Sequence, residues 1–119
     1  MSGLADVFLE LKLILMPFAA LLDVKQDDDK CLYVDTRFIQ ANKKPVYFGG
    51  VMLKKAFVSY HLMPVYLKPE LLDGISIALR KRMQGKSCFN FSKVDDHLFA
   101  ELTSLTRAGF QSYRDQGFV

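Results

Sequence analysis

The first stretch of the chain has the apolar spacing of an amphipathic helix. Its large apolar residues recur every three or four positions, as on one face of a helix with about 3.6 residues per turn. These positions are Leu4, Val7, Phe8, Leu11, Ile14, Leu15 and Phe18. Pro17 has no backbone N–H to donate, so it should end or kink the helix. The pattern therefore predicts an N-terminal helix with one buried face.

After this helix the pattern changes to the two-residue alternation of half-buried strands. We expect strands at 21–25, 31–38, 46–53 and 56–63, separated by short turns. In the second strand, Leu32, Val34 and Phe38 share one side. Gly49 and Gly50 indicate a bulge or a close backbone approach in the third. Four consecutive strands with short connections predict an antiparallel meander.

The second half of the chain returns to helical spacing. Apolar positions predict a helix over 75–83, and Gly85 is a natural residue to follow its C-terminus. The alternating segment 87–91 predicts a fifth strand, and a final helix should begin at Asp95 or Asp96. The fold class is therefore α+β, in the order α-β-β-β-β-α-β-α. We expect a mostly antiparallel five-stranded sheet with the helices packed on one face.

Composition supports a single folded domain over residues 1–119. Half of the residues are hydrophobic and 24% are charged, which is enough apolar surface for one core. The apolar sides of the helices and strands supply the expected core residues. These are Phe8, Leu11, Val34, Val58, Tyr60, Phe89, Phe91, Phe99 and Leu102.

Cysteine content and the N-terminal segment bear on location. Cys31 and Cys88 are too few for a disulfide scaffold. The N-terminal apolar run has no basic region before it and contains Asp6, Glu10 and Lys12, which argues against a secretion signal or a membrane span. We therefore expect a cytoplasmic protein that does not associate with a membrane.

Charge is unevenly distributed along the chain, although the net charge is only +3. Residues 1–35 carry seven acids and three bases, residues 36–93 carry eleven bases and two acids, and residues 94–119 carry four acids and two bases. The basic middle could bind an anion, or the acidic ends could neutralise it in the folded protein. The candidate anion-binding residues are Lys54, Lys55, Arg80, Arg82 and Lys86.

A second candidate site follows from the alternation of the strands. If their apolar sides face the helices, the open side of the sheet carries Tyr33, Asp35, Ser59, His61, Cys88 and Asn90. Imidazole, carboxylate, thiol and hydroxyl groups serve general-base and nucleophilic chemistry, and they also form mixed metal sites. The same residue types suit an ordinary solvated sheet face. A ligand site, a small enzyme using His61 and Cys88, and a plain polar surface all stay open.

Several strings in the middle and at the end of the chain are distinctive. They are PVYFGG at 45–50, FVSYHLMPVY at 57–66, LL and GI at 71–75, KRMQGKSCFNF at 81–91, and LT with AGF at 105–110. Together they resemble the YdhG-like family of small bacterial domains, most of which is uncharacterised. One branch of that family is similar to frataxin in fold and is proposed to be an iron chaperone.

The resemblance implies iron as a ligand. The residues that could hold it are Asp35, His61 and Cys88 on the open face, or the acids Asp6, Glu10 and Asp27 to Asp29. Neutral imidazole and thiolate are needed for the first set, whereas the second would be an oxygen-only site.

The sequence as a whole predicts a small cytoplasmic binding or accessory protein more than an enzyme. The family resemblance implies a metal ligand, and iron in particular. The charge distribution favours an anionic metabolite, with single-stranded nucleic acid as a weaker alternative, because no RNA-recognition string or helix-turn-helix pattern is present. Metal binding needs converging oxygen, nitrogen or sulfur ligands, whereas anion binding needs converging Lys or Arg side chains. A homodimer is left open.

Overall fold

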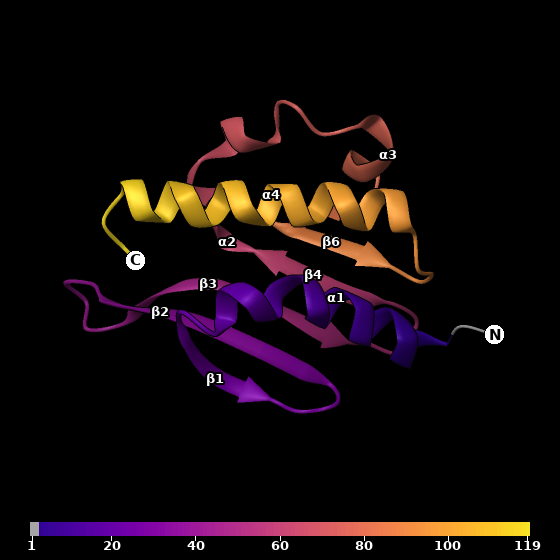
Figure 1. Ribbon diagram of the computed structural model, residues 1–119, viewed down its shortest axis with the longest axis horizontal. Coiled ribbons are helices and arrows are strands. Elements are labelled where there is room, and N and C mark those ends of the chain that lie inside the picture. Colours follow the sequence, from indigo (N-terminus) through magenta and orange to yellow (C-terminus); the bar gives the residue numbers. More distant parts are fainter. Residues whose placement is uncertain (1–2) are drawn as a thin grey trace.

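The computed structural model describes residues 3–119 and has an α+β fold (Figure 1). The elements in chain order are α1 (Leu4–Ala19), β1 (Asp23–Asp27), β2 (Cys31–Ile39), β3 (Pro45–Leu53), β4 (Val58–Leu62), α2 (Met63–Leu67), the 3-10 helix η1 (Pro69–Leu72), α3 (Ile77–Arg80), β5 (Met83–Gln84), β6 (Cys88–Phe91) and α4 (Asp96–Asp115). The predicted fold class is confirmed. None of the described helices is long and apolar enough to cross a bilayer.

All the strands form one sheet in the order β1-β2-β3-β4-β6-β5. Every neighbouring pair is antiparallel, so the predicted meander from β1 to β4 is confirmed. The sheet has six strands and not the expected five, because Met83–Gln84 pairs with β6. The apolar segment 46–53 forms β3 in the middle of the sheet, where both of its edges are paired.

The helix expected over 75–83 is wrong in length, since α3 is a single turn. Ser76 caps it by accepting a hydrogen bond from the backbone N–H of Leu79 at 3.1 Å. Leu79 is its one buried residue, while Ile77 is 76% exposed, so a longer helix here would bury little apolar surface. The chain instead pairs with β6, and the carbonyl of Arg82 accepts from the N–H of Asn90 at 2.8 Å.

Gly85 therefore lies in the β5–β6 hairpin turn and not after a helix. Its φ of 80° is in the left-handed region, which glycine adopts without a steric penalty. The first strand also starts later than expected, at Asp23, because α1 continues past Pro17 to Ala19.

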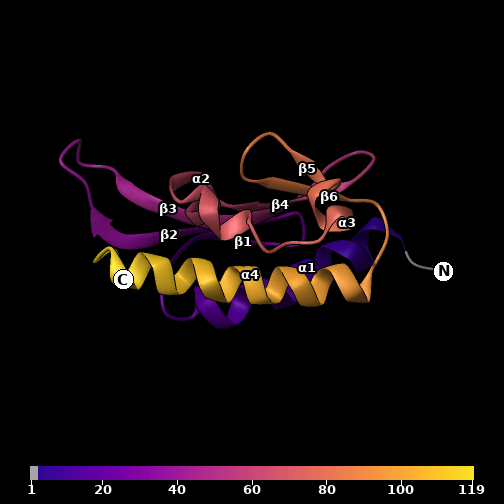
Figure 2. The same ribbon diagram turned by 90° about the horizontal axis from the view of Figure 1, so that it is seen from above.

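The two long helices, α1 and α4, lie on the same side of the sheet, as Figure 2 shows. All the residues expected in the core are buried between these two layers. Hydrogen bonds also join the layers: the hydroxyls of Tyr60 and Thr106 are 2.6 Å apart, and the hydroxyl of Tyr113 donates to the carbonyl of Tyr47 at 2.6 Å. The short elements α2, η1 and α3 each contact α4. Neither of the two long helices covers the opposite side of the sheet, and we call that side the open face.

Phe38 departs from the expected alternation of β2. Leu32 and Val34 are buried as predicted, but the pairing of β2 with β3 shifts between Asp35 and Ile39. Within this irregular stretch the hydroxyl of Thr36 donates to the carbonyl of Val46 at 2.8 Å, inside the fold. Phe38 is consequently 41% exposed and packs against Phe118, with ring centroids 5.1 Å apart.

Replacing Phe89 with alanine should lower the free energy of unfolding by about 3–5 kcal/mol, because a fully buried aromatic ring leaves a cavity. Urea denaturation followed by circular dichroism measures this. The matched control is Ile77→Ala, which removes an exposed apolar side chain and should change the free energy by less than about 1 kcal/mol. Equal effects of the two substitutions would contradict this packing.

Candidate functional site

The six side chains predicted to share the open face do share it. The register between β4 and β6 places His61 opposite Cys88 and Ser59 opposite Asn90. The register between β2 and β3 places Tyr33 opposite Gly50, which in turn pairs with His61 across β3 and β4. Because β3 separates β2 from β4, the structure brings His61 next to Cys88 but keeps Asp35 at a distance of two strands.

Tyr47, which the sequence analysis missed, fills the space above β3. Its ring stacks on Tyr33, with centroids 4.6 Å apart, and lies nearly perpendicular to the His61 ring, with centroids 5.1 Å apart. We call Tyr33, Tyr47 and His61 the aromatic row. Tyr47 was hidden in a nearly all-apolar strand whose alternation breaks at a bulge, since Val34 pairs with Gly49 while Asp35 pairs with Tyr47. The sequence did contain one indication of this arrangement, the Gly49–Gly50 pair. Glycine in a strand often indicates a bulge, and it leaves room that a neighbouring aromatic side chain can fill.

His61 forms a hydrogen bond that ties the aromatic row to β6. Its Nε2 lies 2.7 Å from the hydroxyl oxygen of Ser87, a residue that is 7% exposed. Burial lowers the pKa of His61, so the ring is neutral near pH 7. A serine and a neutral histidine are two parts of a nucleophilic triad, but no described acid bonds to the ring and the serine is buried. The pair therefore serves to orient the imidazole.

Most of the other groups on the open face are also neutral. Desolvation raises the pKa of the Tyr47 phenol and of the Cys31 thiol, which keeps both protonated. Asp35 is 6% exposed, and burial raises the pKa of its carboxyl. The Tyr47 hydroxyl and the Asn90 Oδ1 are buried and have no hydrogen-bond partner among the described residues.

The open face does not hold a metal-ligand set. Across residues 3–119, no group of three or more His, Cys, Asp or Glu side chains is placed to hold a metal ion. Asp35, His61 and Cys88 share the face without converging, and the acids Asp6, Glu10 and Asp27 to Asp29 form no such group either. Within the described chain, the observed geometry supplies no support for the iron site that the resemblance implied.

The candidate anion-binding residues fall in separate places. Lys54 and Lys55 lie in the β3–β4 turn, whereas Lys86 lies in the β5–β6 turn, at the other end of β4 and β6. Arg80 and Lys86 line the same cavity, which has a volume of about 660 Å³. Arg82 lines a different cavity of about 530 Å³. The structure therefore unites only two of the five residues.

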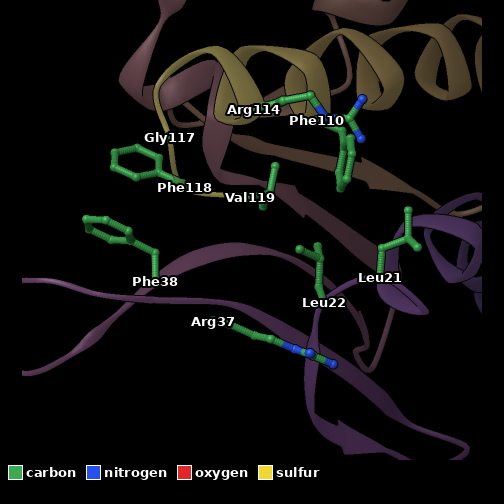
Figure 3. Close-up of a pocket in the computed structure, with 9 residues that line it drawn as sticks. All are labelled: Leu21, Leu22, Arg37, Phe38, Phe110, Arg114, Gly117, Phe118 and Val119. Carbon is green, nitrogen blue, oxygen red and sulfur yellow. The ribbon is translucent and has the colours of Figure 1, made fainter.

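Another cavity, of about 410 Å³, lies between the C-terminal end of α4 and the strand β2 (Figure 3). Phe110 and Arg114 come from α4, with Phe118 just beyond it, and Arg37 and Phe38 come from β2 on the other side. Leu21, Leu22, Gly117 and Val119 complete the lining. Sequence reasoning missed this site because its two arginines are far apart in the chain and belong to no motif.

We compared the chain with protein-family models, curated proteins and solved structures. No protein-family model, curated protein or solved structure matches the chain. The resemblance to the YdhG-like family stays a prediction.

The shifted pKa of His61 predicts a pH dependence of stability. Its pKa is below the unfolded value of about 6.5, so the unfolded chain binds the proton more readily than the folded one. The free energy of unfolding should therefore fall as the pH drops below about 6.5, and His61→Gln should remove that part of the fall. Urea denaturation at about pH 7.5 and about pH 5.5 measures it.

His97→Gln is the control for that experiment, because His97 is exposed at the start of α4. It should keep the wild-type loss of stability on acidification. An equal loss in the wild type and in His61→Gln would show that burial of His61 does not contribute.

Proposed function

We propose that this protein is a cytoplasmic binding protein whose ligand is a small molecule with an apolar body and an anionic group. The observation that carries the proposal is the cavity between α4 and β2. Its walls are mostly apolar, and among the described residues the only charged side chains that line it are Arg37 and Arg114. We call it the Arg37–Arg114 cavity.

The walls suit an apolar ligand body. Leu22 and Phe110 are buried parts of the wall, whereas Leu21 is 62% exposed beside them. The Phe38 and Phe118 rings pack together at 5.1 Å and close one side. Covering such exposed apolar surface releases about 25 cal/mol for each Å² removed from water. The volume of about 410 Å³ also lies within the range of about 300–1,000 Å³ that is usual for small-molecule sites.

Two arginines border the cavity from opposite sides, Arg114 on α4 and Arg37 on β2, and Figure 3 shows the Arg37 side chain running along β2 away from Arg114. An anionic group of the ligand would therefore pair with Arg114, beside the Phe110 wall. Both arginines are exposed, and neither forms an ion pair with a described residue. The Arg114 guanidinium lies 5.3 Å from the centre of the Phe110 ring, a cation–π contact that holds it beside the cavity. Among the described residues, no Asp or Glu side chain lines the cavity. A guanidinium binds carboxylate or phosphate through two parallel hydrogen bonds, which favours either group.

The other basic cavities fit this ligand less well. In the cavity of about 660 Å³, the Arg80 guanidinium already donates to the carbonyl of Leu72 at 2.7 Å. In the cavity of about 530 Å³, Asp95 stands among the basic residues and would repel an anion. The Arg37–Arg114 cavity combines apolar walls with two arginines that form no ion pair with a described residue.

Calorimetric titration with octanoate, octyl phosphate and octanol tests the proposal. We expect the two anions to bind and octanol to bind at least about 10-fold more weakly, since it lacks the charge-assisted hydrogen bonds. The relative affinities of the carboxylate and the phosphate identify the preferred anionic group. Arg114→Gln should weaken anion binding by about 10- to 100-fold, and Arg37→Gln should weaken it less, because Arg37 extends along β2 away from Arg114.

Arg107→Gln is the matched control, because Arg107 is exposed on the same helix and does not line this cavity. It should leave the affinity for octanoate unchanged. Binding of octanol as strong as that of octanoate, or equal weakening by all three substitutions, would overturn the proposed function.

A further inference from the structure

The open face of the sheet lacks the charge of a surface that faces water. The side chains that β2, β3, β4 and β6 place on it are Cys31, Tyr33, Asp35, Tyr47, Met52, Ser59, His61, Cys88 and Asn90, and Asp23 of β1 pairs with Asp35 on the same side. None of them is Lys, Arg or Glu, and all but the buried Asp35 are half-buried. A solvated face of an antiparallel sheet is ordinarily polar, whereas the centre of a protein interface is depleted of charge and enriched in Tyr and Met. The composition favours a face that another protein surface covers.

Two polar atoms on this face, the Tyr47 hydroxyl and the Asn90 Oδ1, are buried without a hydrogen-bond partner among the described residues. A buried polar group without a partner costs about 1–3 kcal/mol. Both atoms are already inaccessible in a single copy, so a covering surface would reach them only after a shift of the Tyr47 or Asn90 side chain.

The two edges of the sheet differ in charge. The β1 edge, residues 23–30, carries four acids and two bases, and we call it the acidic edge. The opposite edge, residues 80–93 around β5 and β6, carries five bases and no acid, and we call it the basic edge. Ion pairs of Lys12 with Asp27 and of Lys25 with Asp23 neutralise part of the acidic edge, whereas no acid in these segments pairs with the basic one. The open face, which carries no Lys, Arg or Glu among the residues named above, thus lies between edges of opposite charge.

We propose that a second copy of this chain covers the open face. Turning that copy by half a turn about an axis parallel to the strands stacks the two faces. It also lays the acidic edge of each copy over the basic edge of the other, so the attraction occurs twice. The alternative is half a turn about an axis that lies in the plane of the face but runs perpendicular to the strands. It would place acidic edge over acidic edge and basic edge over basic edge, which is unfavourable. The charge pattern therefore selects both the partner and its orientation.

The face is large enough for such an interface. The molecule measures 45 × 32 × 23 Å, and Figure 1 looks down the shortest of these axes, onto the sheet and its helix layer. A stable dimer needs roughly 800 Å² from each partner, which is well within one broad face. Two sheets stacked in this way run nearly aligned, about 10 Å apart, with interleaved side chains. The dimer also leaves the Arg37–Arg114 cavity accessible, because Phe110 and Arg114 lie in the helix layer on the other side.

Sedimentation velocity from about 1 µM to about 500 µM tests for the dimer. We expect the wild type to dimerise, and Ser59→Lys, which puts a charge at the centre of the face, to be a monomer that remains folded by circular dichroism. The matched control is Ser104→Lys, which adds the same charge on the exposed side of α4 and should dimerise like the wild type. A wild type that is monomeric at every concentration overturns the proposal, as does equal dimerisation of Ser59→Lys and the wild type.

Charge reversal tests the orientation. Asp29 lies in the turn that precedes β2, and Lys93 follows β6 at the same end of the sheet, so the stacked arrangement brings Asp29 of one copy towards Lys93 of the other. Asp29→Lys and Lys93→Glu should each weaken dimerisation at low salt, and the double variant should restore it. A double variant weaker than either single one overturns the arrangement. A wild type that binds fluorescent oligothymidine through this face and stays monomeric would assign the face to nucleic acid instead.

Discussion

Close backbone packing at the centre of the sheet is the constraint on which the rest of this structure depends. A Cβ at Gly49 would lie 2.6 Å from the carbonyl oxygen of His61, and one at Gly50 would lie 2.6 Å from that of Leu32. Both distances are shorter than real contacts, so only glycine lets β2, β3 and β4 pair here without a shift. A Cβ at Gly50 would also lie 2.7 Å from the Tyr47 hydroxyl oxygen, which occupies the space that a side chain would have filled. The glycines thus set both the register of the sheet and the position of the aromatic row.

Tyr47 connects the two sides of the sheet. Its ring packs between Tyr33 and His61 on the open face, while its carbonyl accepts the hydroxyl proton of Tyr113 from the helix layer. Tyr113 in turn packs its ring edge-on against Phe48 and Phe118, next to the Arg37–Arg114 cavity. One strand therefore positions groups at both proposed binding surfaces. The two surfaces lie on opposite sides of the sheet, so occupation of one leaves the other accessible.

The uneven charge of the sequence becomes a spatial pattern only after folding. The acidic N-terminal part forms α1 and the β1 edge, and the densest basic segment forms the opposite edge. The strands between them present mostly neutral side chains on the open face: burial lowers the pKa of the His61 imidazole and keeps it uncharged near pH 7, and the tyrosine phenols are protonated at that pH in any case. The same burial works against catalysis at Ser87 and His61, since a nucleophile must be reached by its substrate.

Local patterns along the chain determined much of the fold. The three- to four-residue spacing of apolar positions predicted α1 and α4, and the two-residue alternation predicted β1 to β4 and β6, along with the buried residues between the layers. The alternation also put His61 and Cys88 on the open face, because a regular strand alternates sides whatever its neighbours are.

Features that depend on distant partners were decided by the tertiary structure alone. The segment 77–84 divides into one helical turn and a strand because β6 is there to pair with it. Tyr47 turns onto the open face through a bulge that only the pairing with β2 defines. Arg37 and Arg114 form one cavity because α4 ends beside β2. Spacing along the chain carries no information about such neighbours, since contacts between elements form only when the sheet and helices pack together.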